Sequence, residues 1–265
     1  FLKKLFLIFF IIALSSSNVF AAPTHVAEYN INSEENTVTG IAFNPDGTKM
    51  FIVGIIGNEV NEYSLSVGFD LSSTVTWLEK LDVSVQDGNP QDVAFNSDGT
   101  VIFVIGKQNA NIDSWSLSAP YDLSTNSLIA TTALGGNPRA LKFNPDGTKM
   151  FILKLPDKQV EEYALSTAYD PATKSSSTNY SVSDSGDALQ GMGFSSDGTK
   201  MFIVSSDDDY IHEYDLSTGF DVSTASYGGY YEVTTPGADR NISAMAFNSD
   251  GSKMFHGDFK QTPDS

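Results

Sequence analysis

The sequence contains no cysteine, so no disulfide bond holds the fold together. Stability must therefore come from a hydrophobic core, and 265 residues, 40% of them hydrophobic, are enough to bury a large one. Sustained helical periodicity and helix caps are also missing, which argues against alternating strands and helices.

Positively charged residues are scarce, with 15 Lys and Arg against 33 Asp and Glu, giving a formal net charge of −18. Nucleic acids and anionic membranes bind proteins through Lys and Arg, so both are excluded as expected partners. Two interpretations of the acidity stay open: solubility in salty or crowded surroundings, and attraction for a cationic partner.

Histidine is equally rare, with three residues that do not cluster with carboxylates in the sequence. Nucleophile-elbow, phosphate-loop and zinc-ligand motifs are absent as well. The sequence therefore favours a non-catalytic function and predicts no cofactor, except for the divalent cation considered below.

One apolar run stands out, from Leu5 to Leu14, and it follows Lys3 and Lys4. A membrane span needs about 20 apolar residues, whereas a basic start, a short apolar block and small residues near Ala21 are typical of a secretory signal peptide. We expect residues 1–21 to be this signal and residues 22–265 to be a bacterial protein, periplasmic or extracellular, without a membrane span. Loss of two lysines makes its formal charge −20.

A nine-residue phrase, FNPDGTKMF at Phe43–Phe51, recurs four more times with small changes. The later copies begin at Phe95, Phe143, Phe194 and Phe247, so the spacings are 52, 48, 51 and 53 residues. Pro, Asp and Gly in the phrase have the turn chemistry of a β-hairpin, and the period is in the range of propeller blades. Each repeat therefore opens with two antiparallel strands.

A second regularity lies 20 residues after the first Phe of each phrase, where four repeats carry an aromatic residue on an alternating strand. Seven residues further comes an aspartate, at Asp70, Asp122, Asp170 and Asp221, which we expect to cap a turn before a fourth strand. The fifth repeat ends before its aromatic residue.

These patterns predict an all-β protein: a β-propeller of four-stranded antiparallel blades, four full and a fifth partial. Units begin near residues 40, 92, 140, 191 and 244, and a lone N-terminal strand near residues 26–32 is expected to complete the last blade. We expect a monomer that is either a fragment of a longer chain or an incomplete five-bladed ring.

FNPDGTKMFIV followed by VNEYSLS resembles the bacterial YVTN and lactonase-like propeller repeats, and more distantly the WD40-like repeats of TolB type. The resemblance covers essentially all of residues 22–265. It implies a propeller, while the superfamily includes lactonases, cofactor-dependent dehydrogenases and plain binding scaffolds.

Departures from the repeat are better candidates for function than the repeat itself. The first strand of each unit carries Gly or Ala on one face, except at Asp92 and Lys142, which lie in neighbouring units and have opposite charge. Either an ion pair or a ligand site at the channel mouth explains them. Just ahead of this strand stands a variable polar residue, and Gln91, Arg139 and Gln190 complete the predicted binding site.

Asp207, Asp208 and Asp209 occupy the turn between the second and third strands of the fourth unit. Adjacent carboxylates are either an exposed acidic turn or a site for a hard cation such as calcium. We keep both interpretations.

Three functions remain open. The first is an exported binding or interaction scaffold for a protein, small-molecule or glycan ligand. The second is a lactonase-like hydrolase with a cation near Asp92 that polarises a carbonyl. The third is an extracellular structural or adhesive repeat protein.

Overall fold

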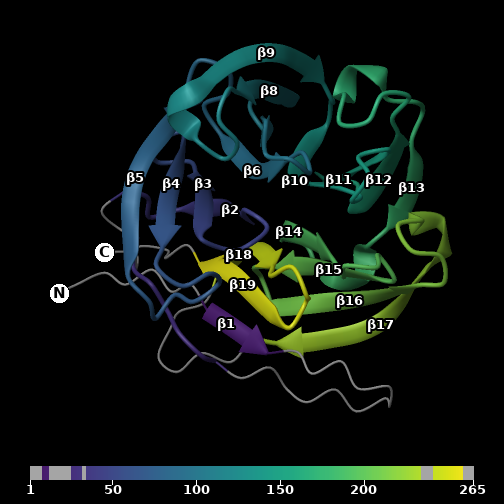
Figure 1. The fold of residues 1–265 in the computed structure, drawn as a ribbon. Coiled ribbons are helices and arrows are strands. Elements are labelled where there is room, and N and C mark those ends of the chain that lie inside the picture. The colour runs from purple at the N-terminus through teal and green to yellow at the C-terminus, as the bar shows by residue number, and fades with distance from the viewer. Residues whose placement is uncertain (1–7, 12–24, 32–33, 234–240, 259–265) are drawn as a thin grey trace, which may run out of the picture.

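Four four-stranded antiparallel sheets stand around a common centre in the computed structural model, which describes residues 8–11, 25–31, 34–233 and 241–258 (Figure 1). Each sheet is a blade whose strands follow the order of the chain from the centre outward. The strands of blades 1 and 2 are β2 (Val38–Phe43), β3 (Lys49–Gly54), β4 (Glu59–Leu65), β5 (Val75–Asp82), β6 (Pro90–Phe95), β7 (Val101–Gly106), β8 (Asn111–Leu117) and β9 (Asn126–Ala133). Those of blades 3 and 4 are β10 (Asn137–Phe143), β11 (Lys149–Leu155), β12 (Gln159–Ala164), β13 (Thr178–Ser181), β14 (Leu189–Phe194), β15 (Lys200–Ser205), β16 (Tyr210–Leu216) and β17 (Ala225–Glu232). The predicted propeller with four full blades is confirmed.

The fifth sheet has three strands, of which β18 (Ile242–Phe247) and β19 (Lys253–Asp258) are the expected first and second strands of a partial blade. The third strand, β1 (Ile8–Ile11), pairs antiparallel with the outer edge of β19. It lies inside the predicted signal peptide, and cleavage after Ala21 remains a prediction.

The hairpin phrase folds as its residues predict. Asp46 accepts hydrogen bonds from the Thr48 backbone N–H and hydroxyl at 2.9 and 2.6 Å, and Gly47 has a φ of 70°, which glycine adopts without strain. The strand after this turn is buried on both faces, with Met50, Phe51 and Ile52 fully inaccessible. A blade sandwiched between two others requires such a strand.

The connection between the third and fourth strands is also capped by its aspartate. In blade 1, Asp70 accepts the Ser72 N–H at 2.9 Å, and the preceding Phe69 has a φ of 56°. In blades 2, 3 and 4 the aspartate is the N-cap of a short 3-10 helix, and the bounds are η1 (Leu123–Thr125), η2 (Pro171–Thr173) and η4 (Val222–Thr224). A further 3-10 turn, η3 (Ser183–Ser185), precedes β14.

Hydrophobic cores lie between neighbouring blades. One cluster joins Phe51 and Val53 of blade 1 to Val93 and Ile102 of blade 2, and the other blade pairs have their own clusters. The cluster that contains Ile41 and Phe255 joins the fifth sheet to blade 1. Since β18 contacts both β14 and β2, the five innermost strands form a closed ring.

Residues 26–31, where most of the lone N-terminal strand was expected, have no regular secondary structure, and residue 32 lies outside the described residues. This segment packs against blade 1: Ile31 is buried in its core and the Tyr29 hydroxyl donates to Val75 O at 3.3 Å. Among the described residues, no helix has the length and apolar character needed to cross a membrane.

Candidate functional site

The innermost strand of every blade begins with a β-bulge, and the bulged residue is the variable polar position of the sequence. In blade 2, for example, the register shifts between Pro90 and Asp92, so Gln91 has no partner in the ladder. The same shift occurs at Thr39, Arg139, Gln190 and Ser243. Each of these five residues is thus the extra residue of a bulge, where the regular pairing of the strand is interrupted.

Three of the bulged residues meet at one end of the ring. The Arg139 guanidinium donates to Gln91 Oε1 at 2.9 Å and to Gln190 Oε1 at 3.4 Å. Burial lowers the pKa of Arg139, and the Arg139 charge, followed by burial, lowers the pKa of Lys107 nearby. This end of the channel therefore places two cations close together.

The other two bulged residues bind backbone instead. Thr39 Oγ1 donates to Pro90 O at 2.9 Å, and Ser243 Oγ donates to Val38 O at 2.6 Å. Each hydroxyl thereby links neighbouring blades. Of the polar ring, Gln91, Arg139 and Gln190 are the residues brought together.

Asp92 and Lys142 form the ion pair that their opposite charges suggested, with Lys142 Nζ 2.8 Å from Asp92 Oδ2. The Asp92 side chain is 5% exposed, and its carboxylate also accepts the backbone N–H groups of Val93 and Leu141, each at 2.9 Å. Burial raises the pKa of Asp92, while Lys142 opposes that shift. Every other blade has Gly or Ala at these positions because the strands crowd: a Cβ on Gly40 would lie 2.6 Å from Asp92 Oδ1.

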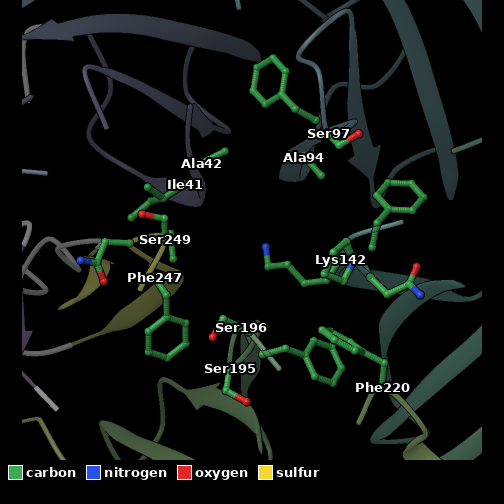
Figure 2. A pocket seen from close by; sticks show the side chains of 18 of the residues that line it. Ile41, Ala42, Ala94, Ser97, Lys142, Ser195, Ser196, Phe220, Phe247 and Ser249 are labelled. Carbon is green, nitrogen blue, oxygen red and sulfur yellow. The ribbon is translucent and has the colours of Figure 1, made fainter. Parts of the chain in front are cut away.

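A cavity of about 460 Å³ opens at the opposite end of the ring, among the hairpin turns (Figure 2). Lys142 is the charged residue of its lining, and its side chain extends toward the middle of the hollow. Aromatic rings form much of the wall, and the polar groups come from the turns: Ser97, Asn144, Ser195, Ser196, Asn248 and Ser249. A largely apolar pocket that contains one charged group, the Lys142 ammonium, and several hydroxyl and amide groups is typical of a small-molecule binding site.

These turn residues were not among the predicted site residues. The second and third positions of the hairpin phrase vary between Asn-Pro, Asn-Ser and Ser-Ser. This variation was the one sequence feature that could have indicated a site at the turns. Asn, Pro and Ser are also common in turns for structural reasons, so the variation did not single out these residues.

Asp207, Asp208 and Asp209 direct their contacts to separate partners. Asp207 accepts the Asp187 N–H at 2.9 Å, whereas Asp208 accepts the Tyr210 N–H at 3.0 Å and lies 3.3 Å from His212 Nε2. Asp209 takes a φ of 59° in the turn. These contacts are those of a capped acidic turn, and calcium binding here remains a prediction.

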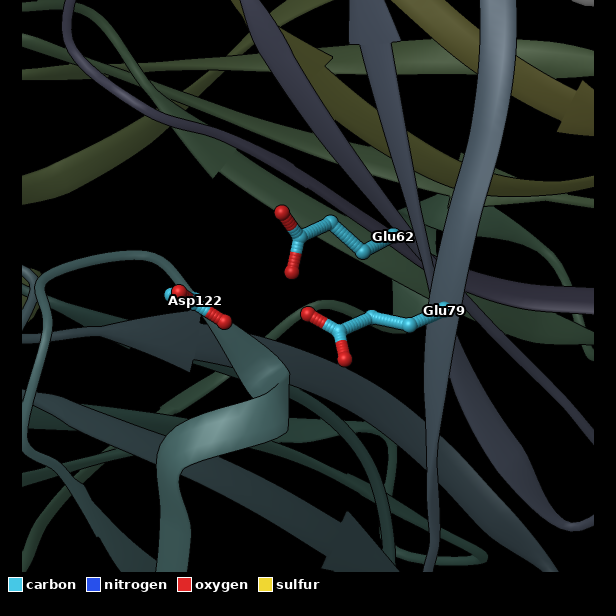
Figure 3. Close-up of side chains that lie close together, drawn as sticks. All are labelled: Glu62, Glu79 and Asp122. Atoms are coloured by element: carbon cyan, nitrogen blue, oxygen red, sulfur yellow. The ribbon is translucent and has the colours of Figure 1, made fainter.

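A different acidic group converges between blades 1 and 2 (Figure 3). Glu62 of β4, Glu79 of β5 and Asp122 before η1 point toward one another, each with one carboxylate oxygen within 4.8 Å of the others. Glu62 already binds Lys49 Nζ at 2.6 Å and the Leu123 N–H at 2.9 Å. Burial, together with the interaction with the Asp122 carboxyl, raises the pKa of Glu79.

No protein-family model matches the sequence, and no curated protein is similar to it. Solved structures share its fold. A periplasmic gluconolactonase from Pseudomonas aeruginosa superposes with a TM-score of 0.53 at 13% identity, over 94% of this chain and 74% of that one. A proposed 6-phosphogluconolactonase from Bacteroides uniformis gives 0.51 at 10% identity, over 97% and 76%. A protein of unknown function from Desulfotomaculum acetoxidans gives 0.51 at 15% identity, over 88% and 68%. Such low identities show the propeller fold alone.

Proposed function

We propose that the protein is an exported binding protein whose central cavity holds a small hydroxylated acid. The observation that carries this proposal is the placement of Lys142, the charged residue in the lining of a cavity of about 460 Å³. One Lys142 N–H binds Asp92, and the remaining N–H donors can bind a carboxylate or another oxyanion. The serine and asparagine side chains of the turns suit the hydroxyl groups of such a ligand.

Charge along the channel supports the same choice. The protein carries a formal charge of −18, yet Arg139 and Lys107 lie at one end of the ring and Lys142 extends into the cavity at the other. These three positive charges lie along the central channel of a protein that is acidic as a whole. They favour the binding of an anionic ligand inside the channel.

Gluconate is a suitable probe, since it combines a carboxylate with several hydroxyl groups. We expect calorimetric titration to detect gluconate binding, and we expect the affinity to fall at least 10-fold in an Asp92→Asn/Lys142→Met variant, which removes both charges and nearly preserves volume. Glucose, which lacks the carboxylate, is the ligand control.

Arg139→Gln is the matched protein control, because it removes a channel cation at the other end. Unchanged gluconate affinity in this variant places the ligand in the cavity. Loss of affinity in Arg139→Gln but not in the double variant would move the site to the Gln91–Arg139–Gln190 end.

The names of two structural neighbours keep a lactonase function as the second candidate. The predicted metal position fits it poorly, because both Asp92 oxygens are engaged by N–H groups and the carboxylate is buried. Lys142 itself could instead polarise a lactone carbonyl that entered the cavity.

Hydrolysis of gluconolactone, followed by pH-stat with and without calcium, separates the two candidates. We expect no rate above that of buffer, because neither an open metal position nor a general base contacts the cavity among its lining residues. If hydrolysis is observed and is lost in the Asp92→Asn/Lys142→Met variant, the lactonase function would replace the binding function as the better hypothesis.

A further inference from the structure

The two outermost strands of blade 4, β16 and β17, differ from those of blade 1 at four corresponding side chains (Figure 1). Asn61 pairs with Lys80 across the blade 1 ladder, as His212 pairs with Tyr230 in blade 4, so the positions can be matched one by one. The blade 1 set is Glu59, Asn61, Trp77 and Lys80, and the blade 4 set is Tyr210, His212, Tyr227 and Tyr230. Blade 4 therefore departs from the repeat where blade 1 carries two charges.

One contact of the set is kept in both blades. Trp77 Nε1 donates to Asn61 Oδ1 at 2.9 Å, and the Tyr227 hydroxyl lies 3.1 Å from His212 Nδ1. In each case a polar group of the third strand holds an aromatic residue of the fourth strand. This contact is part of the frame of the blade.

The other contact is replaced. In blade 1, Lys80 Nζ binds Glu59 Oε2 at 2.6 Å. In blade 4 the rings of Tyr210 and Tyr230 are stacked instead, with centroids 4.4 Å apart and planes 10° from parallel. An aromatic stack thus takes the place of an ion pair, and Tyr230 occupies the position of the cation. We call Tyr210, His212, Tyr227 and Tyr230 the aromatic patch.

The aromatic patch is on the side of blade 4 that faces blade 3. Tyr227 packs edge-on against Tyr214, with centroids 5.4 Å apart, and Tyr214 belongs to the core between these two blades. Tyr231 packs instead against the core toward the fifth sheet. Blades 3 and 4 lie within the continuous described range 34–233, in which Tyr227 is 40% exposed and Tyr230 is 56% exposed.

Negative charge surrounds the aromatic patch. The charges that act most on His212 come from Asp208, Asp207 and Asp184, and Asp208 Oδ2 lies 3.3 Å from His212 Nε2. Burial nevertheless lowers the pKa of His212 below its ordinary value of 6.5, so the imidazole is neutral at neutral pH. The face of a tyrosine ring is negative as well. Rings and carboxylates therefore present the same sign of charge to a ligand.

We propose that the aromatic patch binds an arginine side chain of a partner protein. A guanidinium is planar and stacks on aromatic faces, so on the exposed ring of Tyr230 it extends the stack that Tyr210 begins. Its N–H groups bind carboxylates, and Asp184 is an exposed acid whose charge acts on Tyr227. The partner thus supplies at blade 4 the positive charge that Lys80 supplies at blade 1.

The openness of the aromatic patch favours a protein partner over a small molecule. A small-molecule site buries about 70–90% of its ligand, whereas Tyr227 and Tyr230 are well exposed on an outermost strand. A protein surrounds one stacked arginine with further contacts, as at the centre of many interfaces. The formal charge of −18 attracts a basic surface in the same direction.

The test uses a fluorescein-labelled peptide, GSRGSRG, and fluorescence anisotropy at low ionic strength. We expect saturable binding to the purified protein. Lysine at both arginine positions keeps the charge without the planar group and should weaken binding at least 5-fold. Citrulline keeps the planar shape without the charge and should weaken it at least 10-fold.

Tyr230→Ser removes the exposed ring without changing the net charge, and it should weaken the arginine peptide at least 5-fold. Trp77→Ser is the matched control, because it removes an exposed ring of blade 1, where Lys80 and Glu59 keep their ion pair. This variant should bind the peptide as the wild type does. Circular dichroism verifies the fold of both variants.

Equal binding of the arginine and lysine peptides, or unchanged affinity in Tyr230→Ser, would overturn the proposal, because net charge alone would then explain the attraction. Binding of cellohexaose that is lost in Tyr230→Ser and that the arginine peptide does not displace would overturn it too, since a glycan would then be the occupant. Gluconate affinity should be the same in Tyr230→Ser and the wild type, so this test is independent of the cavity.

Discussion

Replacing Lys142 with methionine is expected to lower the free energy of unfolding by about 3 kcal/mol, because Asp92 would stay buried without its counter-ion. The Asp92 side chain is 5% exposed and the Lys142 side chain is 21% exposed, and the carboxylate lies 2.8 Å from the ammonium. Partial access of water to Lys142 places the effect at the lower end for a buried pair. Urea denaturation monitored by tryptophan fluorescence measures it.

The double variant Asp92→Ala/Lys142→Ala is the control for this loss. It gives blades 2 and 3 the small residues that the other innermost strands already have. We expect it to be more stable than Lys142→Met, since removing both charges also removes the desolvation cost. A double variant whose loss equals the sum of the losses measured for Asp92→Ala and Lys142→Ala alone would show that the charges are not coupled.

The repeat made the architecture predictable. Each hairpin is encoded locally by Asp and Gly in one phrase, and the buried strand that follows is uniformly apolar. Closure of the ring depends on contacts between β18 and β2, which are about 200 residues apart. An N-terminal strand was expected to complete the last blade near residues 26–32, but the strand that pairs with β19 is β1, which no local pattern indicates.

The candidate site was predictable in part. Asp92 and Lys142 were recognised because they break a small-residue rule, and Arg139 because the bulge position varies. The cavity itself was not predictable from the sequence. Its position at the hairpin end depends on how the sheets are arranged around the central axis. Glu79 and Asp122 meet through packing of two blades, which no spacing in the sequence indicates.

Phe151 and Phe202 occupy the same strand position in successive blades, and within the described part of the chain they differ in the number of rings that contact them. Phe151 packs against Phe194 and Phe220, with centroids at 4.7 and 6.3 Å, and is fully buried. Phe202 packs against Phe247 at 5.1 Å and is 3% exposed. The pair therefore allows the same ring to be compared in two different aromatic surroundings.

Phe151→Ala is expected to lower the free energy of unfolding by about 3–5 kcal/mol, because it leaves a cavity in the core between blades 3 and 4. Phe202→Ala should cost about 1 kcal/mol less, since one aromatic contact fewer is lost. Urea denaturation of both variants, with Phe151→Leu and Phe202→Leu as volume controls, gives the difference. Equal losses at the two positions would contradict this expectation, because the second ring contact of Phe151 would then add nothing measurable to stability.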